Sequence, residues 1–297
     1  KKRSNNMRFD RRELKARARR AMGETNPRFW VVTLVYILLT TGVQVLLSLA
    51  ASALTGPVGL GSSLIFFNIL FLLYSVVIQF GFQLWSLWTW RRMNPGLGAL
   101  TQGFSIPGRV ILMEVFIFLR VLGWSMVLIL VMTLFLMPVA AALSPVVYLL
   151  YTGVIYAVMI VIMLRYTLAP YLLADRPDDG ASAAIRRSVE LMRGWKWELF
   201  KLLLSFLGWQ LINWVLSTAV FIFLCAQAGL FQMSVGMDTL LIYQSVSNGL
   251  PNLILSALVT LPLSLWLTPY LSVSQAGFYD MVRQFAPRPD ASEMPPL

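Results

Sequence analysis

Long apolar runs separated by short polar segments dominate the chain between Trp30 and Tyr279. Six runs stand out: Trp30 to Leu54, Leu64 to Trp90, Val110 to Leu136, Val146 to Leu173, Leu199 to Cys225 and Leu250 to Tyr279. Each run exceeds the about 20 residues that an α-helix needs to cross about 30 Å of hydrocarbon. The pattern predicts an all-α, polytopic membrane protein with six transmembrane helices.

The same pattern divides the chain into three parts. Residues 1–29 form a basic N-terminal segment, residues 30–280 form the membrane domain, and residues 281–297 form a Pro-rich tail. In the N-terminal segment, helix-forming residues from Arg11 to Met22 place Leu14 and Ala18 at helical spacing. We expect this stretch to form a short surface helix.

A second polar segment, between the fourth and fifth runs, also has helical periodicity. Its apolar positions share one face: Ala181, Ile185, Val189 and Met192. We expect residues 181–193 to form an amphipathic helix on the membrane surface, capped by Asp178, Asp179 or Ser182 and ended by Gly194. The residues expected to contact lipid headgroups here are Arg186, Arg187, Arg193, Trp195 and Trp197.

Apart from Arg120 and Arg165, which lie inside runs, the basic residues are confined to the two terminal segments and to alternate connections between the runs. Residues 1–29 hold 11 of the 24 Lys and Arg residues, 91–109 hold 3, 174–201 hold 6, and the tail after Asp280 holds 2. The connections at 55–63, 137–145 and 226–249 hold none. By the positive-inside rule, both termini and both basic loops lie in the cytoplasm.

Aromatic residues gather at the ends of the runs that this topology places near the cytoplasm. They are Trp85, Trp88, Trp90, Trp195, Trp197, Trp209 and Tyr279. Tyr and Trp side chains are enriched at the headgroup level of membranes. We therefore expect these residues to form an interfacial aromatic belt.

Composition narrows the functional classes. With 58% apolar residues and a mean hydropathy of +0.72, the chain is unlike a soluble domain. A net charge of +11 could indicate a nucleic-acid partner. However, the basic residues lie beside the ends of the apolar runs. Attraction to anionic lipid headgroups therefore explains their positions without a nucleic-acid partner.

The chain has no His and one Cys, Cys225, which removes the ligands of most zinc and haem sites and makes a disulfide within the chain impossible. The acidic cluster of Asp175, Asp178 and Asp179 is interpreted as a helix cap rather than a metal site. We expect no metal, no cofactor and no enzymatic activity.

Three ionisable residues lie clearly inside the apolar runs, away from their ends: Glu114, Arg120 and Arg165. Such side chains are costly in lipid unless they are paired, hydrated or turned inward. Glu114 and Arg165 could meet across the hairpin of the third and fourth runs, whereas Arg120 lies on another face of its helix. The group could bind an anionic ligand, but an ion pair or backbone contact that fixes helix packing is the favoured interpretation.

Three prolines lie away from the N-terminal ends of their runs: Pro170, Pro262 and Pro269. Each removes a backbone donor and bends its helix. Such bends can act as hinges, as in transporters with broken helices. They can equally shape a static bundle, which is the favoured interpretation.

Four segments, taken in order, carry a family resemblance. They are RRELKARARRAM from Arg11, RYTLAPYLLADRP from Arg165, SVELMRGWKWELFKLLLSFLGW from Ser188 and LTPYLSVSQAGFYD from Leu267. Together they resemble a bacterial family of multi-pass membrane proteins known as domain of unknown function 975. The resemblance covers nearly the whole chain and implies a polytopic bacterial membrane protein, but it implies no reaction and no catalytic residue.

The leading hypothesis is a non-enzymatic integral protein of the bacterial cytoplasmic membrane, acting through helix and lipid contacts in an accessory, assembly or protective role. Its expected partners are membrane lipids with anionic headgroups, and a second copy or another membrane protein. One alternative is a small-solute transporter or channel with a polar site at Arg165, Glu114 and Arg120. A second alternative is a lipid-modifying membrane enzyme.

Overall fold

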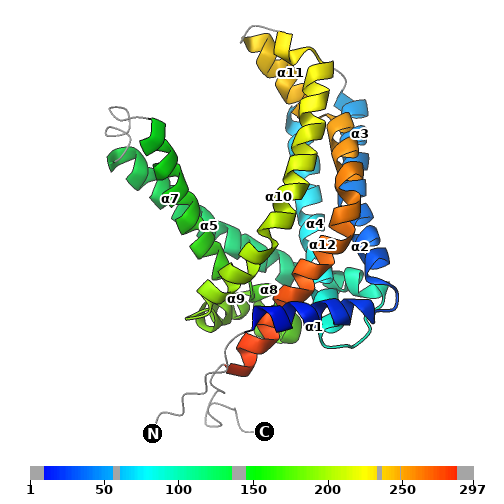
Figure 1. The fold of residues 1–297 in the computed structure, drawn as a ribbon, viewed down its shortest axis with the longest axis vertical. Helices are drawn as coiled ribbons and strands as arrows, with labels where there is room; N and C mark the ends of the chain where they lie inside the picture. Colours follow the sequence, from blue (N-terminus) through cyan, green and yellow to red (C-terminus); the bar gives the residue numbers. More distant parts are fainter. Residues whose placement is uncertain (1–9, 56–60, 136–144, 233–235, 248, 286–297) are drawn as a thin grey trace. The chain divides into compact units, whose positions relative to one another are not determined.

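The computed structural model describes residues 10–55, 61–135, 145–232, 236–247 and 249–285, all without β-strand (Figure 1). The helices are α1 (Arg11–Gly23), α2 (Phe29–Ile37), α3 (Val43–Thr55), α4 (Gly61–Trp90), α5 (Pro107–Phe135), α7 (Pro145–Leu164), α8 (Ala169–Asp175), α9 (Gly180–Leu191), α10 (Lys196–Gln227), α11 (Met237–Ser247) and α12 (Leu250–Phe285). The short elements are a π-helix, η1 (Leu38–Gly42), and three 3₁₀ helices, η2 (Leu97–Ser105), η3 (Pro177–Asp179) and η4 (Leu230–Gln232). Most of the predicted Pro-rich tail, from residue 286 on, lies outside the described residues.

Six helical segments among the described residues are long and apolar enough to cross a membrane. They are Phe29–Ala50, Phe66–Trp90, Pro107–Val131, Thr152–Asp175, Lys196–Gln227 and Leu250–Phe285. Each overlaps one of the apolar runs of the sequence. The prediction of an all-α fold with six spans is therefore confirmed.

The chain divides into two compact units that interleave along the sequence. Among the described residues, unit 1 holds residues 106–201 and 275–285, and unit 2 holds residues 10–105 and 202–274. Hydropathy alone does not mark this division, because two of its boundaries fall inside the continuous helices α10 and α12.

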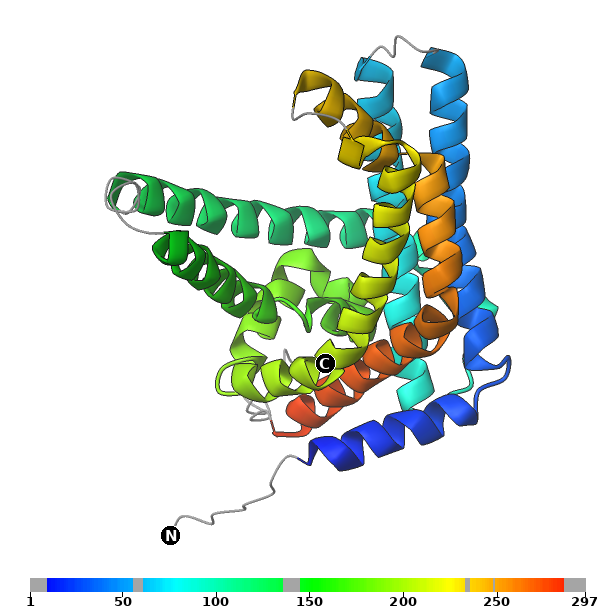
Figure 2. The same cartoon turned by 45° about the horizontal axis from the view of Figure 1, so that its top comes forward.

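Unit 1 is built on a helical hairpin. Helices α5 and α7 contact each other and diverge toward one end (Figure 2), and α8 and α9 pack against each other and against α5. The amphipathic pattern of α9 explains this packing, because Ala181, Ala184 and Ile185 are all buried on one face. The sequence prediction of a helix at 181–193 therefore agrees with α9, which ends two residues earlier.

Unit 2 contains the other amphipathic helix, α1. Its N-cap is Asp10, whose carboxylate accepts hydrogen bonds from the backbone N–H groups of Arg12 at 2.8 Å and Glu13 at 3.4 Å. The residues that share its apolar face, Leu14, Ala18, Ala21 and Met22, are at most 6% exposed. The predicted surface helix is present, with its apolar face buried and four of its arginines, Arg12, Arg17, Arg19 and Arg20, exposed.

Close backbone packing holds η2 against α4 in unit 2. A Cβ atom at Gly81 would lie 2.0 Å from the backbone oxygen of Leu100, and one at Gly103 would lie 2.4 Å from that of Val77. Both positions therefore require glycine, because a backbone oxygen cannot swing aside. The sequence analysis did not predict this 3₁₀ helix, whose polar and glycine residues show no apolar periodicity.

The predicted aromatic belt is wrong for three of its members. Trp85 and Tyr279 are 0% exposed and Trp90 is 6% exposed, so these side chains lie within the protein. Trp85 stacks on Phe82 with ring centroids 5.5 Å apart. The residue types suit a membrane interface and a tightly packed helix end equally well, so composition alone could not separate the two.

Candidate functional site

The fourth apolar run is interrupted at Arg165 in unit 1. Helix α7 ends at Leu164, α8 begins at Ala169, and the four residues between them form turns. The Arg165 carbonyl, freed from helical bonding, accepts a hydrogen bond from Ser188 Oγ at 2.8 Å. A side chain of α9 thus satisfies a backbone group that the break exposes.

The Arg165 side chain is half-buried at this break. Its Nε atom is buried and has no hydrogen-bond partner among the described residues. The neighbouring cations Arg193 and Lys196 lie within electrostatic range, since the charges of Arg165 and Arg193 both act on Lys196. Positive charge therefore accumulates where the fourth span is discontinuous.

The expected pairing of Glu114 with Arg165 is not seen. Neither residue forms an ion pair with any described residue, although both belong to unit 1. Glu114 is half-buried on α5, and Arg120 is exposed on the same helix. The structure therefore does not unite the three intramembrane charges in one polar cluster.

The three prolines differ in their setting. Pro170 lies in the first turn of α8, where a missing backbone N–H costs nothing, so it follows the break rather than bending a continuous helix. Pro262 and Pro269 lie inside α12, which continues through both. Of these three prolines, only Pro170 lies beside an interruption of its span.

Carboxylates and cations pair throughout the connections of unit 1. Asp175, whose side chain is 12% exposed, accepts hydrogen bonds from Tyr279 Oη at 2.7 Å and from Arg283 at 2.5 Å. Arg109 pairs with Asp178 at 3.3 Å. The described residues contain no cluster of three His, Cys, Asp or Glu side chains that could hold a metal ion.

The cap predicted for the interfacial helix has a different role from the one expected. Asp179 is the N-cap residue of α9, but its side chain makes no capping hydrogen bond and instead forms an ion pair with Arg187. Arg187 is thereby neutralised. Arg186 and Arg193 are exposed.

The two tryptophans beside α9 point in different directions. Trp195 stacks on Phe285, with centroids 5.5 Å apart, and lies edge-on to Phe278 at 6.5 Å, so it is turned into the protein. Trp197 is 64% exposed and stacks on Phe200 at 5.2 Å. Of the pair, only Trp197 presents an open ring at the start of α10.

In unit 2, cations of α1 contact aromatic rings. Lys15 Nζ lies 4.3 Å from the ring centroid of Phe206 and donates a hydrogen bond to Ser205 Oγ at 3.0 Å. Burial, and secondarily the charge of Arg19, lower the pKa of Lys15 from its usual value. The Arg17 guanidinium lies over the Trp90 ring, 4.5 Å from its centroid. Aromatic faces therefore hold cations here.

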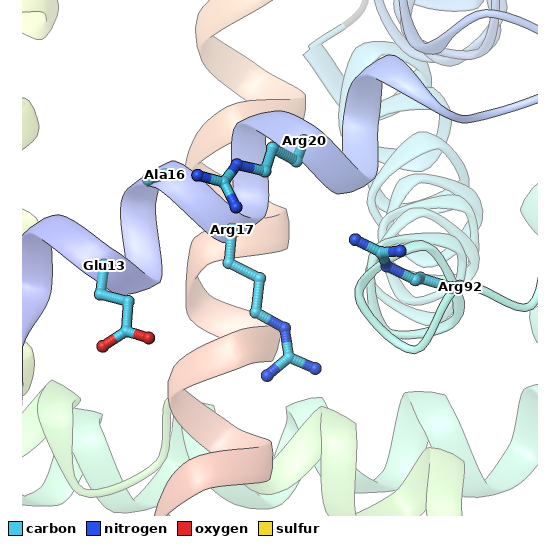
Figure 3. Close-up of a pocket in the computed structure, with 5 residues that line it drawn as sticks. All are labelled: Glu13, Ala16, Arg17, Arg20 and Arg92. Carbon is cyan, nitrogen blue, oxygen red and sulfur yellow. The ribbon is translucent and has the colours of Figure 1, made fainter.

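A cavity of about 350 Å³ lies between α1 and the end of α4. Five residues line it: Glu13, Ala16, Arg17, Arg20 and Arg92 (Figure 3). Four of them recur at helical spacing on α1, so the sequence contained a signal for that half of the cavity. The contribution of Arg92 could not be foreseen, because it depends on the packing of α1 against α4.

The backbone at Arg92 has an unusual conformation. Helix α4 ends in a Schellman motif, in which the N–H of Arg92 donates to the Thr89 carbonyl at 3.0 Å and that of Met93 to the Trp88 carbonyl at 2.9 Å. This motif places Arg92 in the left-handed region, with φ of 58°. Glycine normally occupies this position, because an L side chain there costs about 1–2 kcal/mol.

The chain matches a known protein family over almost its whole length. The family model described as "Protein of unknown function (DUF975)" matches residues 7–286, almost the entire chain. The chain belongs to the DUF975 family. Searches of curated proteins and of solved structures gave no match. Family membership agrees with the predicted resemblance and with the six apolar helices, and it brings no activity with it.

Proposed function

We propose that this DUF975 protein is a non-enzymatic integral protein of the bacterial cytoplasmic membrane that acts through helix and lipid contacts. Its role would be that of an accessory, assembly or protective factor, with both termini in the cytoplasm. The observation that carries the proposal is the exposed surface around α9, where Arg186, Arg193 and Trp197 remain open beside a docked amphipathic helix.

The chemistry of this surface favours anionic lipid headgroups. Arginines next to an exposed indole match the level of phosphates and glycerol groups in a bilayer, and each cation near an anionic leaflet contributes about 1 kcal/mol. Arg187 adds little to this attraction, because Asp179 already neutralises it. The proposal therefore rests on Arg186 and Arg193.

The long helix α5 supports the second element of the proposal, contact with lipid tails or with apolar helices of a partner. Its large side chains are open along most of its length, including Phe118, Met126 and Leu134 at 62–64% exposed. Such a surface suits lipid tails, a second copy of this chain or another membrane protein.

A lipid-competition experiment tests the headgroup preference. The full chain would be reconstituted in equal amounts of phosphatidylglycerol and phosphatidylcholine, and the retained lipids counted by native mass spectrometry. We expect phosphatidylglycerol to be enriched, and the double variant Arg186→Gln, Arg193→Gln to lose about half of the enrichment. Arg187→Gln, on the same helix, is the matched control and should leave it unchanged.

Two results would overturn the proposal. One is a wild-type protein that retains both lipids equally. The other is chemical conversion of a lipid during prolonged incubation, detected as a new mass, since that would indicate a lipid-modifying enzyme.

The interrupted fourth span favours a second candidate function, transport of a small anionic or amphiphilic solute. Discontinuous helices line the binding sites of many transporters, and Arg165 lies at the break with a buried Nε atom that has no partner among the described residues. We nevertheless expect Arg165→Ala to lower thermal stability more than any solute flux in proteoliposomes. A variant with unchanged melting and abolished uptake would establish transport instead.

A further inference from the structure

The geometry points to a discrete oxyanion site in unit 2: the cavity lined by Arg17, Arg20 and Arg92 binds a phosphate group, carried by a lipid headgroup or free in solution. This site is separate from the lipid-contacting surface proposed around α9. All of its lining residues belong to unit 2, whereas α9 belongs to unit 1.

The residues that line the cavity carry a net positive charge, which favours a bound anion. Three guanidinium groups and one carboxylate, that of Glu13, belong to the residues that line the cavity (Figure 3). Neither Arg17 nor Arg20 forms an ion pair with any residue in the part of the chain that the structure describes. Arginine cannot relieve mutual repulsion by losing a proton, so a bound anion is favoured between these guanidinium groups.

The side-chain chemistry suits a phosphate group. Planar guanidinium groups donate paired, parallel hydrogen bonds that match two oxygens of a phosphate. The Trp90 ring, which is 6% exposed, supports the Arg17 guanidinium from one side. A cavity of about 350 Å³ has room for a phosphate and the small group attached to it.

The backbone supplies an independent observation at the third arginine. Arg92 occupies the left-handed position that closes the Schellman motif, where glycine would be free of strain. A non-glycine residue at such a strained position points to a role for its side chain. The ion pair of Arg92 with Glu24, 3.3 Å long with both side chains more than half exposed, is too weak to account for it.

This arrangement makes Arg92→Gly a discriminating variant. Glycine relieves the backbone strain, so the ligand-free protein should melt at the same temperature as the wild type or higher. The same change removes one arm of the site, so phosphate affinity should fall at least 10-fold. Loss of binding without loss of folding separates a ligand site from a structural contact.

Two further variants sharpen the assignment. Arg17→Gln with Arg20→Gln should abolish binding, and Glu24→Gln should leave it intact because the Glu24 pair is dispensable. Arg12→Gln, an exposed arginine of the same helix outside the cavity, is the matched control. Its affinity should equal that of the wild type.

The measurement has two arms that identify the source of the phosphate. In the first, the full chain in phosphatidylcholine nanodiscs is titrated with inorganic pyrophosphate and followed by thermal shift and calorimetry. In the second, phosphatidic acid is added to the nanodiscs and the bound copies are counted by native mass spectrometry. Binding in the first arm assigns a soluble ligand, and binding in the second arm alone assigns a lipid headgroup.

The assignment is overturned if neither arm distinguishes the wild type from the Arg17→Gln, Arg20→Gln variant. It is also overturned if Arg92→Gly binds as tightly as the wild type. Neither result touches the lipid preference around α9, which is tested with Arg186 and Arg193. A failure of that preference alone would likewise leave the cavity assignment standing.

Discussion

The two units of the molecule stabilise their positive charges by different means. In unit 1, cations pair with carboxylates: Arg109 with Asp178, Arg187 with Asp179, Lys201 with Glu198 and Arg283 with Asp175. In unit 2, cations of α1 lie over aromatic rings, and three arginines surround a cavity. Pairing with carboxylates is therefore the main contact of the paired cations in unit 1, and contact with aromatic rings is the main one for the α1 cations of unit 2.

The kind of contact that a cation makes determines whether it can also bind an anionic ligand. An arginine already bound to a carboxylate must break that pair before it can bind a phosphate, whereas one over an aromatic ring keeps its outward N–H groups free. By this criterion the open cations include Arg17 and Arg20 of the α1 cavity and Arg186 and Arg193 on the α9 surface, whereas Arg92 must first leave its exposed pair with Glu24.

The units also differ in how their helices pack. In unit 2, Gly81 of α4 lies against the backbone of η2, and Gly103 of η2 lies against the backbone of α4. In unit 1, nothing lies within 4 Å of a Cβ atom built at Gly123 on α5. Equally apolar helices thus have different surroundings: one is fixed by protein, the other is open along its length. Hydropathy cannot distinguish them, because lipid and protein interior favour the same side chains.

The largest expected effect comes from breaking the close packing of unit 2. Gly81→Ala places a methyl group against the Leu100 backbone oxygen, so it should destabilise the protein by about 3 kcal/mol. Gly123→Ala is the control and should be neutral or slightly stabilising, because alanine is the better helix former. Thermal unfolding in detergent provides the measurement, and equal melting of the two variants would contradict the packing described for η2.

A smaller loss is expected from the ion-pair network of unit 1. Asp175→Ala removes the acceptor of both Tyr279 and Arg283 and should cost about 2 kcal/mol, because charged hydrogen bonds at a largely buried carboxylate are lost. Asp178→Ala removes a carboxylate that is 96% exposed and should cost less than about 1 kcal/mol. The same thermal assay checks both, and a larger loss at Asp178 would reverse the assigned roles.

The smallest effect concerns pH and Lys15. Because its pKa is lowered below the usual 10.5, mainly by burial, the folded protein binds fewer protons at this site than the unfolded chain just below pH 10.5. Stability should therefore rise with pH through that window, and Lys15→Met, which keeps the apolar stem, should remove this rise. Comparing the melting of the two proteins between about pH 8 and pH 10 tests the sign. A wild-type curve parallel to that of Lys15→Met would exclude the effect.

The sequence predicted the features that depend on length and periodicity. Six apolar runs gave the six spans, and the apolar spacing of Leu14 and Ala18, and of Ala181 and Ile185, gave the two amphipathic helices. Such signals are local, because a helix buries one face whatever its partner is. The family resemblance, confirmed over residues 7–286, rested on the same segments.

The features that the sequence did not predict depend on tertiary contacts. The break at Arg165 has Pro170 as its local signal, but only the Ser188 hydrogen bond shows that α9 satisfies the exposed carbonyl. Likewise, Arg92 joins the α1 cavity because α1 packs on α4, a contact between segments about 70 residues apart in the chain. No periodicity within either segment could have indicated it.

Cysteine labelling tests the membrane topology on which the proposed functions depend. In a Cys225→Ala background, single cysteines at Thr101, Ser182 and Gln244 would be exposed to a membrane-impermeant maleimide in intact cells and after permeabilisation. With the basic segments in the cytoplasm, position 244 should react in intact cells, and positions 101 and 182 only after permeabilisation. Labelling of position 101 or 182 in intact cells would contradict the account.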